Sequence, residues 1–331
     1  MSVLEVRGLS KEFPAGGMLH RARLHAVDDV TFSLRPGRIT ALAGESGSGK
    51  STVARLITRL YDQTAGDVLF EGRAVGRRRR EALRYRSQVQ LIFQDPFGSL
   101  NPAKTVRHHL ARPLRIHRLA SRRDVRARVE ELLETVGLVP PAAIADKYPH
   151  ELSGGQRQRV AIARALAVEP RVVVADEPIS MLDVSIRVGI LNLMRDLKDR
   201  GIAFLYVTHD LASARYVADD IIVMYAGQVV EQGPVDQVLA SPLHPYTRLL
   251  IESVPDGHGG LAPIEARRGS AAAAVDPPPG CRFVERCPLA VPVCRERTPA
   301  LVEARPGQAA RCHVTAPAPD NREDIHAQPA A

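Results

Sequence analysis

Tryptophan is absent from the 331 residues of this chain, and the aromatic residues together amount to 4%. Proteins that hold single-stranded nucleic acid stack its bases on such rings. Their scarcity therefore weakens the nucleic-acid interpretation that a net charge of +8 invites. The arginines are also scattered, apart from the run Arg77–Arg80, which we expect to be a solvated turn after Gly72.

Long apolar runs are absent as well. Runs such as 201–207 and 172–175 have the length of strands and fall well short of the roughly 18 residues that a membrane-spanning helix needs. The opening residues, MSVLEVRGLSKEF, show neither a basic start with an apolar core nor a small-residue cleavage site. We therefore expect a cytosolic chain. Its balance of 45% apolar and 25% charged residues is ordinary for a globular protein, and its length of 331 residues predicts about two domains.

Cysteine is rare and confined to one region. The chain has four cysteines, and all lie within its last 51 residues at Cys281, Cys287, Cys294 and Cys312. Their spacing lacks the C-x2-C pairs of common zinc sites and the close spacing of ferredoxin clusters, and a cytosolic location disfavours disulfides. The pattern thus indicates one four-thiol site but leaves an iron–sulfur cluster, zinc (for which His313 could substitute as a ligand) and metal-free thiols open.

Composition divides the chain into four parts. Residues 1–255 alternate short apolar runs with helical patterns, which predicts a mostly parallel sheet with helices packed on it. Residues 256–280 are rich in Gly, Ala and Pro and are predicted to be a linker. The cysteine segment at 281–314 follows, and we expect the tail at 315–331 to be disordered. Within the first part, the stretch 91–153 is predicted to be mainly helical.

The strongest motif is Gly44-Glu45-Ser46-Gly47-Ser48-Gly49-Lys50-Ser51, which fits the phosphate-binding pattern G-x-x-x-x-G-K-[ST], or Walker A. An apolar run at 39–43 precedes it and a helical stretch at 52–60 follows, so the motif joins a strand to a helix. Glycines let backbone N–H groups converge on phosphate oxygens at a helix N-terminus. Lys50 is then predicted to reach the β and γ phosphates and Ser51 to bind Mg²⁺. This context disfavours the alternative, a chance glycine-rich turn.

A second motif follows an uninterrupted apolar run at 172–175, which predicts a strand buried on both faces. Asp176 and Glu177 stand at its carboxyl end, where open α/β sheets bind their ligands. We expect Asp176 to hold the Mg²⁺ shell and Glu177 to orient or deprotonate the attacking water. A solvated acidic pair is the alternative if this motif is considered alone.

The third motif, Leu-Ser-Gly-Gly-Gln at 152–156, opens a helix that we expect to continue through Leu166. Ser153 and Gln156 form a capping box, which explains them without any ligand. Two glycines in the first turn of a helix, however, each cost about 1 kcal/mol relative to alanine. They favour a close approach between this helix N-terminus and an anion.

In this order, the three motifs resemble the ATP-binding subunits of ABC transporters. The resemblance implies an α/β fold over residues 1–255, a P-loop NTPase ABC cassette in which a mostly parallel sheet is joined by antiparallel β and helical subdomains, with a small cysteine-containing C-terminal extension. It also gives a role to residues that mean little in isolation. Gln94 corresponds to the glutamine that senses the γ phosphate and the membrane partner and helps to bind Mg²⁺. His209 corresponds to the switch histidine, and Phe13 to the aromatic that stacks on adenine.

The resemblance thus implies two sets of residues in one site. The catalytic set is Glu177, His209 and Gln94, and the magnesium set is Ser51, Gln94 and Asp176. The residues expected to bind ATP itself are Phe13, Gly44, Ser46, Gly47, Gly49, Lys50, Ser51 and Thr52.

The chain carries one copy of each motif, and this count has a consequence within that family. The signature of one subunit closes over the ATP bound to the phosphate loop of the other, so we expect a dimer. In this chain the signature residues are Ser153, Gly154, Gly155 and Gln156, and Asp183 lies in the dimer-contact loop. Without a spanning helix, the subunit is expected to act on separate membrane subunits, with 94–102 as the contact.

Three further segments resemble the dipeptide and oligopeptide importer ATPases: DPFGSLNP at 95–102, SPLHPYTRLL at 241–250, and the terminal cysteine segment. HELSGGQRQR at 150–159 and LDVSIR at 182–187 are more similar to the F-type than to the D-type partner. The resemblance implies a heterodimer with a D-type ATPase, two permease subunits, an extracytoplasmic binding protein and a peripheral position at the cytoplasmic face of the inner membrane. It also implies a [4Fe-4S] cluster on the four cysteines, as in some members.

One departure keeps the substrate open. Met181 stands where the dimer-contact loop usually has a small residue, and this variant resembles members that import other solutes, such as oligosaccharides, nickel or glutathione-like compounds. An exporter ATPase is the closer rival, but the HPYT phrase and the terminal segment disfavour it. A non-transport ABC ATPase that acts on nucleic acid or the ribosome would carry two cassettes or a large insertion, so we expect no nucleic-acid partner.

Overall fold

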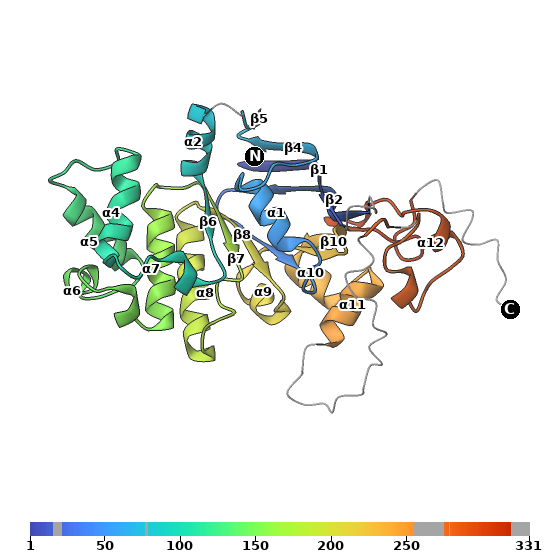
Figure 1. The fold of residues 1–331 in the computed structure, drawn as a ribbon. Helices are drawn as coiled ribbons and strands as arrows, with labels where there is room; N and C mark the ends of the chain where they lie inside the picture. Colours follow the sequence, from blue (N-terminus) through green and yellow to red (C-terminus); the bar gives the residue numbers. More distant parts are fainter. Residues whose placement is uncertain (16–21, 77–78, 254–274, 278, 319–331) are drawn as a thin grey trace.

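A computed structural model describes residues 1–15, 22–76, 79–253, 275–277 and 279–318. The predicted linker at 256–280 lies outside the described residues except for 275–277 and 279–280, and so does the predicted tail beyond residue 318. The first two arginines of the predicted turn at 77–80 also lie outside them. In Figure 1 the sheets occupy the centre, α4 to α6 lie at one end and the C-terminal segment lies at the other.

A central sheet of eight strands organises the molecule, in the order β11-β12-β10-β9-β3-β8-β7-β6. Its five parallel strands are β3 (Ile39–Ala43), β6 (Val89–Ile92), β7 (Val172–Asp176), β8 (Ala203–Thr208) and β9 (Asp220–Tyr225). The apolar runs that predicted strands at 39–43, 172–175 and 203–208 therefore form β3, β7 and β8, and the predicted mostly parallel sheet is confirmed.

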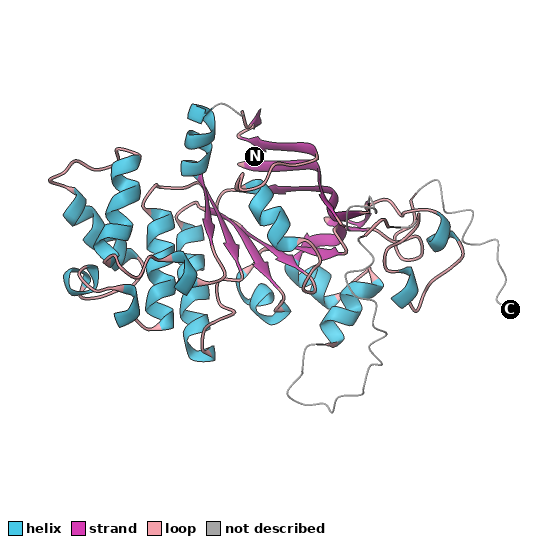
Figure 2. Cartoon of the chain, in the orientation of Figure 1, coloured by secondary structure: helices cyan, strands magenta, loops and turns pink. Residues whose placement is uncertain are grey.

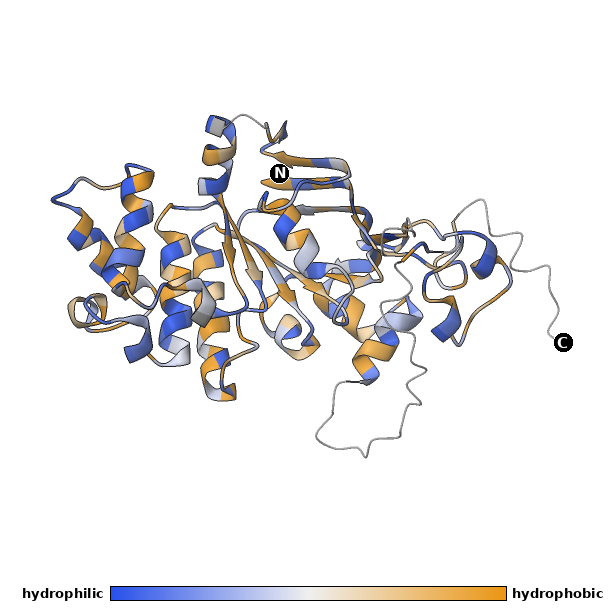
Figure 3. Ribbon diagram, viewed as in Figure 1, coloured by the Kyte–Doolittle hydropathy of each residue, from blue (hydrophilic) through white to orange (hydrophobic). Residues whose placement is uncertain are grey.

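The parallel strands are buried on both faces, as uninterrupted apolar runs predict. In β8, Phe204 and Tyr206 face one hydrophobic cluster, whereas Leu205 and Val207 face another. Figure 3 shows these strands as hydrophobic ribbons at the centre of the molecule. The carboxyl ends of β3, β7 and β8 consequently meet at one edge of a rigid, dry layer.

An antiparallel sheet lies against one face of the central sheet. Its order is β2-β1-β4-β5, and its strands are β1 (Leu4–Pro14), β2 (Arg23–Leu34), β4 (Ala65–Phe70) and β5 (Arg73–Ala74). Helix α1 (Lys50–Ile57) contributes Val53, Leu56 and Ile57 to the core that the two sheets share. This sheet is the antiparallel subdomain that the family resemblance implied.

Helices cover the other face and extend from it as a bundle (Figure 2). In α5 the buried residues Val129, Leu132 and Leu133 follow the predicted helical spacing, and Gly137 ends the segment with a positive φ of 71°. The helices before the signature are α2 (Arg79–Gln88), α3 (Pro96–Ser99), α4 (Val106–Ile116), α5 (Val125–Thr135) and α6 (Pro141–Ala145). The signature opens α7 (Gly154–Leu166), and the helices that follow are α8 (Val184–Asp199), α9 (Leu211–Val217), α10 (Val235–Ala240) and α11 (Pro245–Glu252).

The cysteine-containing segment returns to the central sheet. After α12 (Val293–Glu296), strand β11 (Val302–Arg305) and strand β12 (Gln308–Ala310) form a hairpin, and β12 pairs antiparallel with β10 (Gln228–Pro234). Glu231 of β10 lies opposite Ala310 in this ladder. The first three strands in the sheet order, β11, β12 and β10, are thus antiparallel, in contrast to the five parallel strands that follow.

The buried carboxylate of Glu231 stabilises the packing of the C-terminal hairpin on the central sheet. The side chain of Glu231, which is 0% exposed, accepts hydrogen bonds from the backbone N–H groups of Leu243 and His244 at 2.8 and 2.9 Å and from Nε2 of Gln308 at 2.7 Å. A buried carboxylate is tolerated when donors satisfy it in this way. Burial also lowers the pKa of His244 to about 3, so its neutral Nδ1 accepts from the N–H of Tyr246 at the start of α11. Glu231 therefore joins β10, the α11 N-terminus and β12.

Within the part of the chain that the structure covers, none of the helices combines the length and apolar character that crossing a bilayer requires.

Candidate active site

The phosphate loop joins the carboxyl end of β3 to the N-terminus of α1. Gly49 caps α1 in the left-handed region, with φ at 104°, where a side chain is strained. At Gly44 an added Cβ would lie 2.3 Å from the carbonyl oxygen of Met224, so only glycine fits against β9. The glycines therefore leave the backbone of the loop accessible, and its N–H groups and the helix N-terminus suit a phosphate group.

Lys50 lies inside this loop and is only 5% exposed. Its Nζ donates to the carbonyl oxygens of Gly44 and Glu45 at 2.7 Å each, and weakly to Oγ of Ser48 at 3.4 Å. Burial lowers the pKa of Lys50, and the neighbouring carboxylates oppose that shift. A desolvated ammonium held by neutral carbonyl and hydroxyl oxygens is well suited to exchange them for the more strongly attracting oxygens of a polyphosphate.

A hydroxyl and a carboxylate converge beside Lys50. Oγ of Ser51 donates to Oδ1 of Asp176 at 3.1 Å, which joins the first turn of α1 to the end of β7. Asp176 is 7% exposed, and burial raises its pKa. Hard oxygen donors of this kind are the ligands that Mg²⁺ takes in nucleotide sites, so the two residues fit the predicted metal role.

Glu177 is the next residue, and its backbone is strained. Its φ is 45°, an uncommon value for a residue other than glycine, and its N–H donates to the carbonyl oxygen of Val207 on β8 at 3.0 Å. Nε2 of Gln94 donates to one carboxylate oxygen at 2.9 Å, and Nδ1 of His209 lies 3.1 Å from the other. Three predicted catalytic residues, from three different segments, thus meet at one carboxylate.

These groups surround a single cavity of about 580 Å³, within the usual size of a ligand pocket. Six of the eight residues predicted to bind ATP line it, and Phe13 and Gly44 do not. Two apolar residues of β2, for which no role was predicted, line it as well. The lining is Leu24, Ala26, Ser46, Gly47, Gly49, Lys50, Ser51, Thr52, Gln94, Glu177 and His209. Leu24 and Ala26 could not be found by motif, since small apolar residues on a strand carry no signal of their own.

Phe13 lies next to this cavity but does not line it. It pairs across the β1–β2 ladder with Leu24, which does. Its ring meets the ring of Tyr61 edge-on at 5.8 Å between centroids, and Nζ of Lys11 lies 5.1 Å from its centroid. Adenine stacking on Phe13 therefore stays a prediction.

The signature residues lie elsewhere, at the start of α7. Oγ of Ser153 accepts from the N–H of Gln156 at 3.2 Å, and Oε1 of Gln156 accepts from the N–H of Ser153 at 3.0 Å, which confirms the predicted capping box. Among the described residues, the cavity lining includes none of the signature. Asp183, at the N-terminus of α8, is exposed, and so are its apolar neighbours Met181 and Val184.

The two signature glycines face different surroundings. A Cβ on Gly155 would lie 2.6 Å from Cγ2 of Ile186, whereas one on Gly154 would make an ordinary contact at 3.6 Å with Cδ2 of Leu182. Packing against α8 thus explains Gly155 within this chain. Gly154 has no such need, so the anion explanation applies to it alone.

This difference gives a testable pair of variants. Gly155→Ala is expected to lower the free energy of unfolding by about 1 to 3 kcal/mol through overpacking. Gly154→Ala should leave it unchanged or raise it by up to about 1 kcal/mol, because alanine favours the helix, and should still reduce ATPase activity in the assembled transporter. Urea unfolding of both variants measures the first effect, and equal stability of the two would contradict it.

The four cysteines are all free thiols, with Cys294 and Cys312 buried and the other two half-buried. The N–H of Cys281 donates to the carbonyl oxygen of Cys294 at 2.7 Å. Burial raises the pKa of Cys281 to about 11, with smaller contributions from the other three cysteines, and burial also raises the pKa of Cys287. The fold thus gathers the thiols in one region, yet the residues it describes contain no group of three or more His, Cys, Asp or Glu side chains placed to hold a metal ion.

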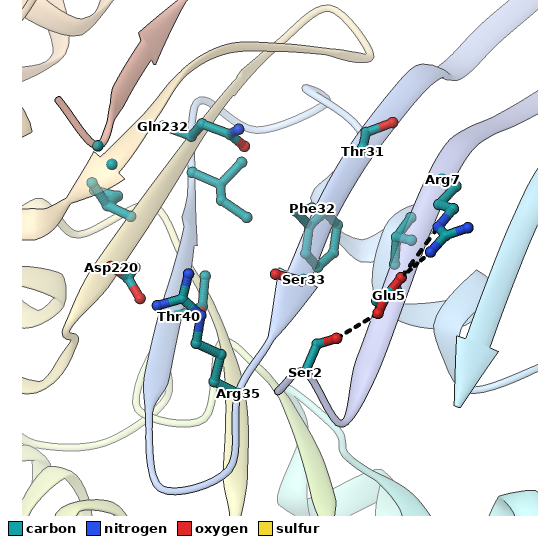
Figure 4. Close-up of a pocket in the computed structure, with 15 residues that line it drawn as sticks. Ser2, Glu5, Arg7, Thr31, Phe32, Ser33, Arg35, Thr40, Asp220 and Gln232 are labelled. Atoms are coloured by element: carbon teal, nitrogen blue, oxygen red, sulfur yellow. Dashed lines mark hydrogen bonds and ion pairs between the residues drawn. The ribbon is translucent and has the colours of Figure 1, made fainter. Parts of the chain in front are cut away.

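A second cavity, of about 440 Å³, lies between the antiparallel sheet and the central sheet (Figure 4). Glu5 on its wall is held by Arg7 and by Oγ of Ser2, and Asp220 is held by Arg38. Both carboxylates are already paired, and the glycine-rich phosphate loop that carries Lys50 lines the other cavity instead.

The loop also receives two contacts that the sequence did not reveal. The N–H of Glu45 donates to the hydroxyl of Tyr246 at 2.8 Å, and the carboxylate of Glu45 pairs with Arg286. Tyr246 belongs to the HPYT motif at 244–247, which was noted in the sequence only for its similarity to the oligopeptide importer ATPases. That motif was the one feature of the sequence that could have pointed to the contact with Glu45.

Fold and site together define a nucleotide-hydrolysing ABC cassette. The family models agree: the ABC transporter family matches residues 27–180, and the C-terminal region of oligopeptide/dipeptide transporters matches residues 230–294. The chain belongs to the ABC transporter ATP-binding proteins that carry this oligopeptide/dipeptide C-terminal region.

Similar proteins include the oligopeptide transport ATP-binding protein AppF of Bacillus subtilis (strain 168), which is 42% identical over 322 residues that cover 95% of this chain and 97% of AppF. The putative oligopeptide transport ATP-binding protein YkfD of the same organism is 43% identical over 320 residues, with coverages of 95% and 96%. Among solved structures, the dimeric post-hydrolysis state of the cassette MJ0796 bound to ADP and Pi superposes with a TM-score of 0.62 at 30% identity, over 70% of this chain and 98% of that one.

Proposed function

We propose that this chain is the ATP-hydrolysing subunit that energises uptake of dipeptides and oligopeptides through separate membrane permeases. The observation that carries the ATPase part is the carboxylate of Glu177, held by Gln94 and His209 beside the loop of Lys50. The peptide part rests on the matched C-terminal region at 230–294 and on relatives named as oligopeptide transport ATP-binding proteins.

The residues divide the chemistry among them. Lys50 moves from the carbonyl oxygens it holds to the β and γ phosphates of ATP, and the loop N–H groups bind the remaining phosphate oxygens. Ser51 and Asp176, with Gln94, would hold Mg²⁺, which neutralises the charge on the phosphates when it is bound. Glu177 then accepts a proton from the attacking water, or orients that water.

His209 and Gln94 act on Glu177 rather than on the water. Because each binds a different carboxylate oxygen, the plane of the carboxylate is fixed before substrate arrives. The positive φ of Glu177 aims its side chain away from the strand toward the cavity that it lines. The site therefore needs little rearrangement of its general base.

We infer that a second subunit completes the site. Ser153, Gly154 and Gln156 do not line the cavity of their own chain, and exposed apolar residues, Met181 and Val184, lie beside the equally exposed Asp183. These features support closure of the signature of one subunit over the nucleotide of another. The partner chain we propose is a D-type ATPase, with two permeases and an extracytoplasmic binding protein, on the cytoplasmic face of the inner membrane.

The test is reconstitution. The chain would be purified with candidate permeases and a D-type ATPase, placed in liposomes with the binding protein, and assayed for ATPase activity with peptides, an oligosaccharide, nickel and glutathione. Stimulation by peptides alone supports the proposal. Stimulation by one of the other solutes instead would overturn the peptide assignment and favour the resemblance at Met181 to importers of other solutes. The ATPase assignment would be unaffected.

The [4Fe-4S] cluster stays a separate prediction for Cys281, Cys287, Cys294 and Cys312. Their gathering in one region supports it, but the thiols as placed do not form a ligand set. A visible iron–sulfur absorption band in the full chain, lost in Cys287→Ser, would establish the cluster. A colourless protein that carries one zinc ion after anaerobic purification would exclude it.

A further inference from the structure

Glu45, the first variable residue of the phosphate loop, binds a residue of the cysteine-containing segment. Two guanidinium nitrogens of Arg286 bind its two carboxylate oxygens at 3.0 and 3.1 Å, a bidentate pair. The side chain of Arg286 is 15% exposed and that of Glu45 is 41% exposed, so the arginine is shielded from water while the carboxylate still reaches the surface of the loop. The backbone N–H of Glu45 donates to the hydroxyl of Tyr246 at 2.8 Å.

Arg286 is itself held in place by aromatic rings. Its guanidinium lies 5.7 Å from the ring centroid of Tyr225 and 5.6 Å from that of Phe283. Tyr225, Tyr246 and Phe283 pack on one another, with centroid separations of 4.7, 5.2 and 5.6 Å. Strand β9, helix α11 and the cysteine segment thus meet in a rigid cluster that aims Arg286 at the loop.

A second arginine of the same segment reaches the loop indirectly. Arg282 binds the carbonyl oxygen of Ala226 and a carboxylate oxygen of Asp28. The next residue, Gly227, donates its N–H to the carbonyl oxygen of Ser48 in the phosphate loop at 2.9 Å. The β9–β10 turn therefore lies between the cysteine segment and the loop and contacts both.

We propose that Arg286 is a positioning residue for nucleotide binding, which acts through Glu45 to hold the phosphate loop in its binding conformation. The carbonyl oxygen of Glu45 is an acceptor for Lys50, and the N–H of Glu45 is fixed by Tyr246. Movement of Glu45 would therefore displace both the carbonyl oxygen that binds Lys50 and the backbone at the start of the phosphate loop. The C-terminal region of this family becomes, on this proposal, part of the nucleoside di- and triphosphate site of its own chain.

This proposal rests on ATP binding at the phosphate loop, so its test separates the two. The full-length chain would be titrated with ATP and with ADP, and ATPase kinetics would be measured for Arg286→Ala and for a control, Arg295→Ala. Arg295 forms an exposed ion pair with Glu285 in the same segment, with side chains 62% and 72% exposed. We expect Arg286→Ala to raise the Kd and KM for nucleotide about 5-fold to 20-fold with little change in kcat, and Arg295→Ala to change neither.

A double-mutant cycle shows whether the effect passes through Glu45. In the background of Glu45→Gln, which weakens the pair, Arg286→Ala should raise the Kd by less than about 2-fold further. Tyr246→Phe, a change that keeps the buried ring and removes only the hydroxyl, should raise the Kd even if Arg286→Ala does not fold. Arg286→Lys should restore part of the affinity.

Three results would overturn the proposal: equal Kd values for Arg286→Ala and Arg295→Ala, an undiminished effect of Arg286→Ala in the Glu45→Gln background, or a fall in kcat with unchanged KM. Lys50→Met is included as the reference for the site. If nucleotide still binds to Lys50→Met as tightly as to the parent chain, the assignment of the phosphate loop fails instead.

Discussion

Replacement of Glu177 by glutamine is expected to reduce ATP hydrolysis by about 10²-fold to 10⁴-fold, the usual contribution of a positioned general base. The amide keeps the size of the carboxylate and one acceptor oxygen, so either Gln94 or His209 retains its partner. It cannot accept a proton from water. ATP should still bind, since Glu177 does not belong to the phosphate loop.

Single-turnover hydrolysis in the assembled transporter measures this effect, and a nucleotide titration of the same variant checks that binding survives. Glu169→Gln is a matched control, because Glu169 is an exposed glutamate with a positive φ of 54° that lies before β7. Hydrolysis at the parent rate in Glu177→Gln would move the role of general base to another group.

Lys50→Met is expected to weaken ATP binding by about 10²-fold and to abolish measurable turnover. Methionine keeps much of the apolar stem inside the loop, whereas the ammonium that would bind phosphate is lost. Hydrogen bonds to charged groups are each worth about 1.5 to 3 kcal/mol, and each 1.4 kcal/mol is tenfold in affinity. The burial of Lys50 increases the loss, because water screens its charge poorly.

The measurement is a nucleotide titration of the folded variant, with circular dichroism to confirm the fold. Lys104→Met serves as the control, since Lys104 is exposed and outside the cavity lining. Comparable affinities of the two variants would show that nucleotide binds somewhere other than this loop.

Local pattern predicted those parts of the fold that depend on neighbouring residues. β3, β7 and β8 were visible as apolar runs because strands buried on both faces need no alternation. The phosphate loop was visible because few residue types allow its backbone, as the φ of 104° at Gly49 illustrates. Helix α5 was visible from its spacing, and the position of Glu177 followed from its place at the end of a predicted strand.

Contacts between distant segments could not be predicted in the same way. The pairing of Arg286 with Glu45 joins residues 241 positions apart, and that of Tyr246 with Glu45 joins residues 201 apart. The residue types near Glu45 do not indicate such a partner. A glutamate or arginine that pairs across the fold cannot be distinguished in the sequence from one that lies unpaired on the surface. Only the packing of Phe283, Tyr225 and Tyr246 brings them together.

The signature shows a third case, in which one pattern carried two explanations. Capping accounted for Ser153 and Gln156, and the hydrogen bonds confirm it. The two glycines looked equivalent in sequence, yet only Gly155 lies against Ile186 of α8. Which glycine is required by packing depends on the approach of a helix some thirty residues further along the chain, and propensity scales contain no such information.

The pairing of β12 with β10 also affects how copies of this chain meet during synthesis. Until residues 308–310 have emerged and folded back, Glu231 and Gln232 present unpaired backbone donors and acceptors along one strand. An open strand of this kind is a template for strand addition from another chain and hence for aggregation. The hairpin thus covers this edge of β10 and leaves the short, charged strand β11 outermost, so a chain shortened before the hairpin would be expected to lose solubility.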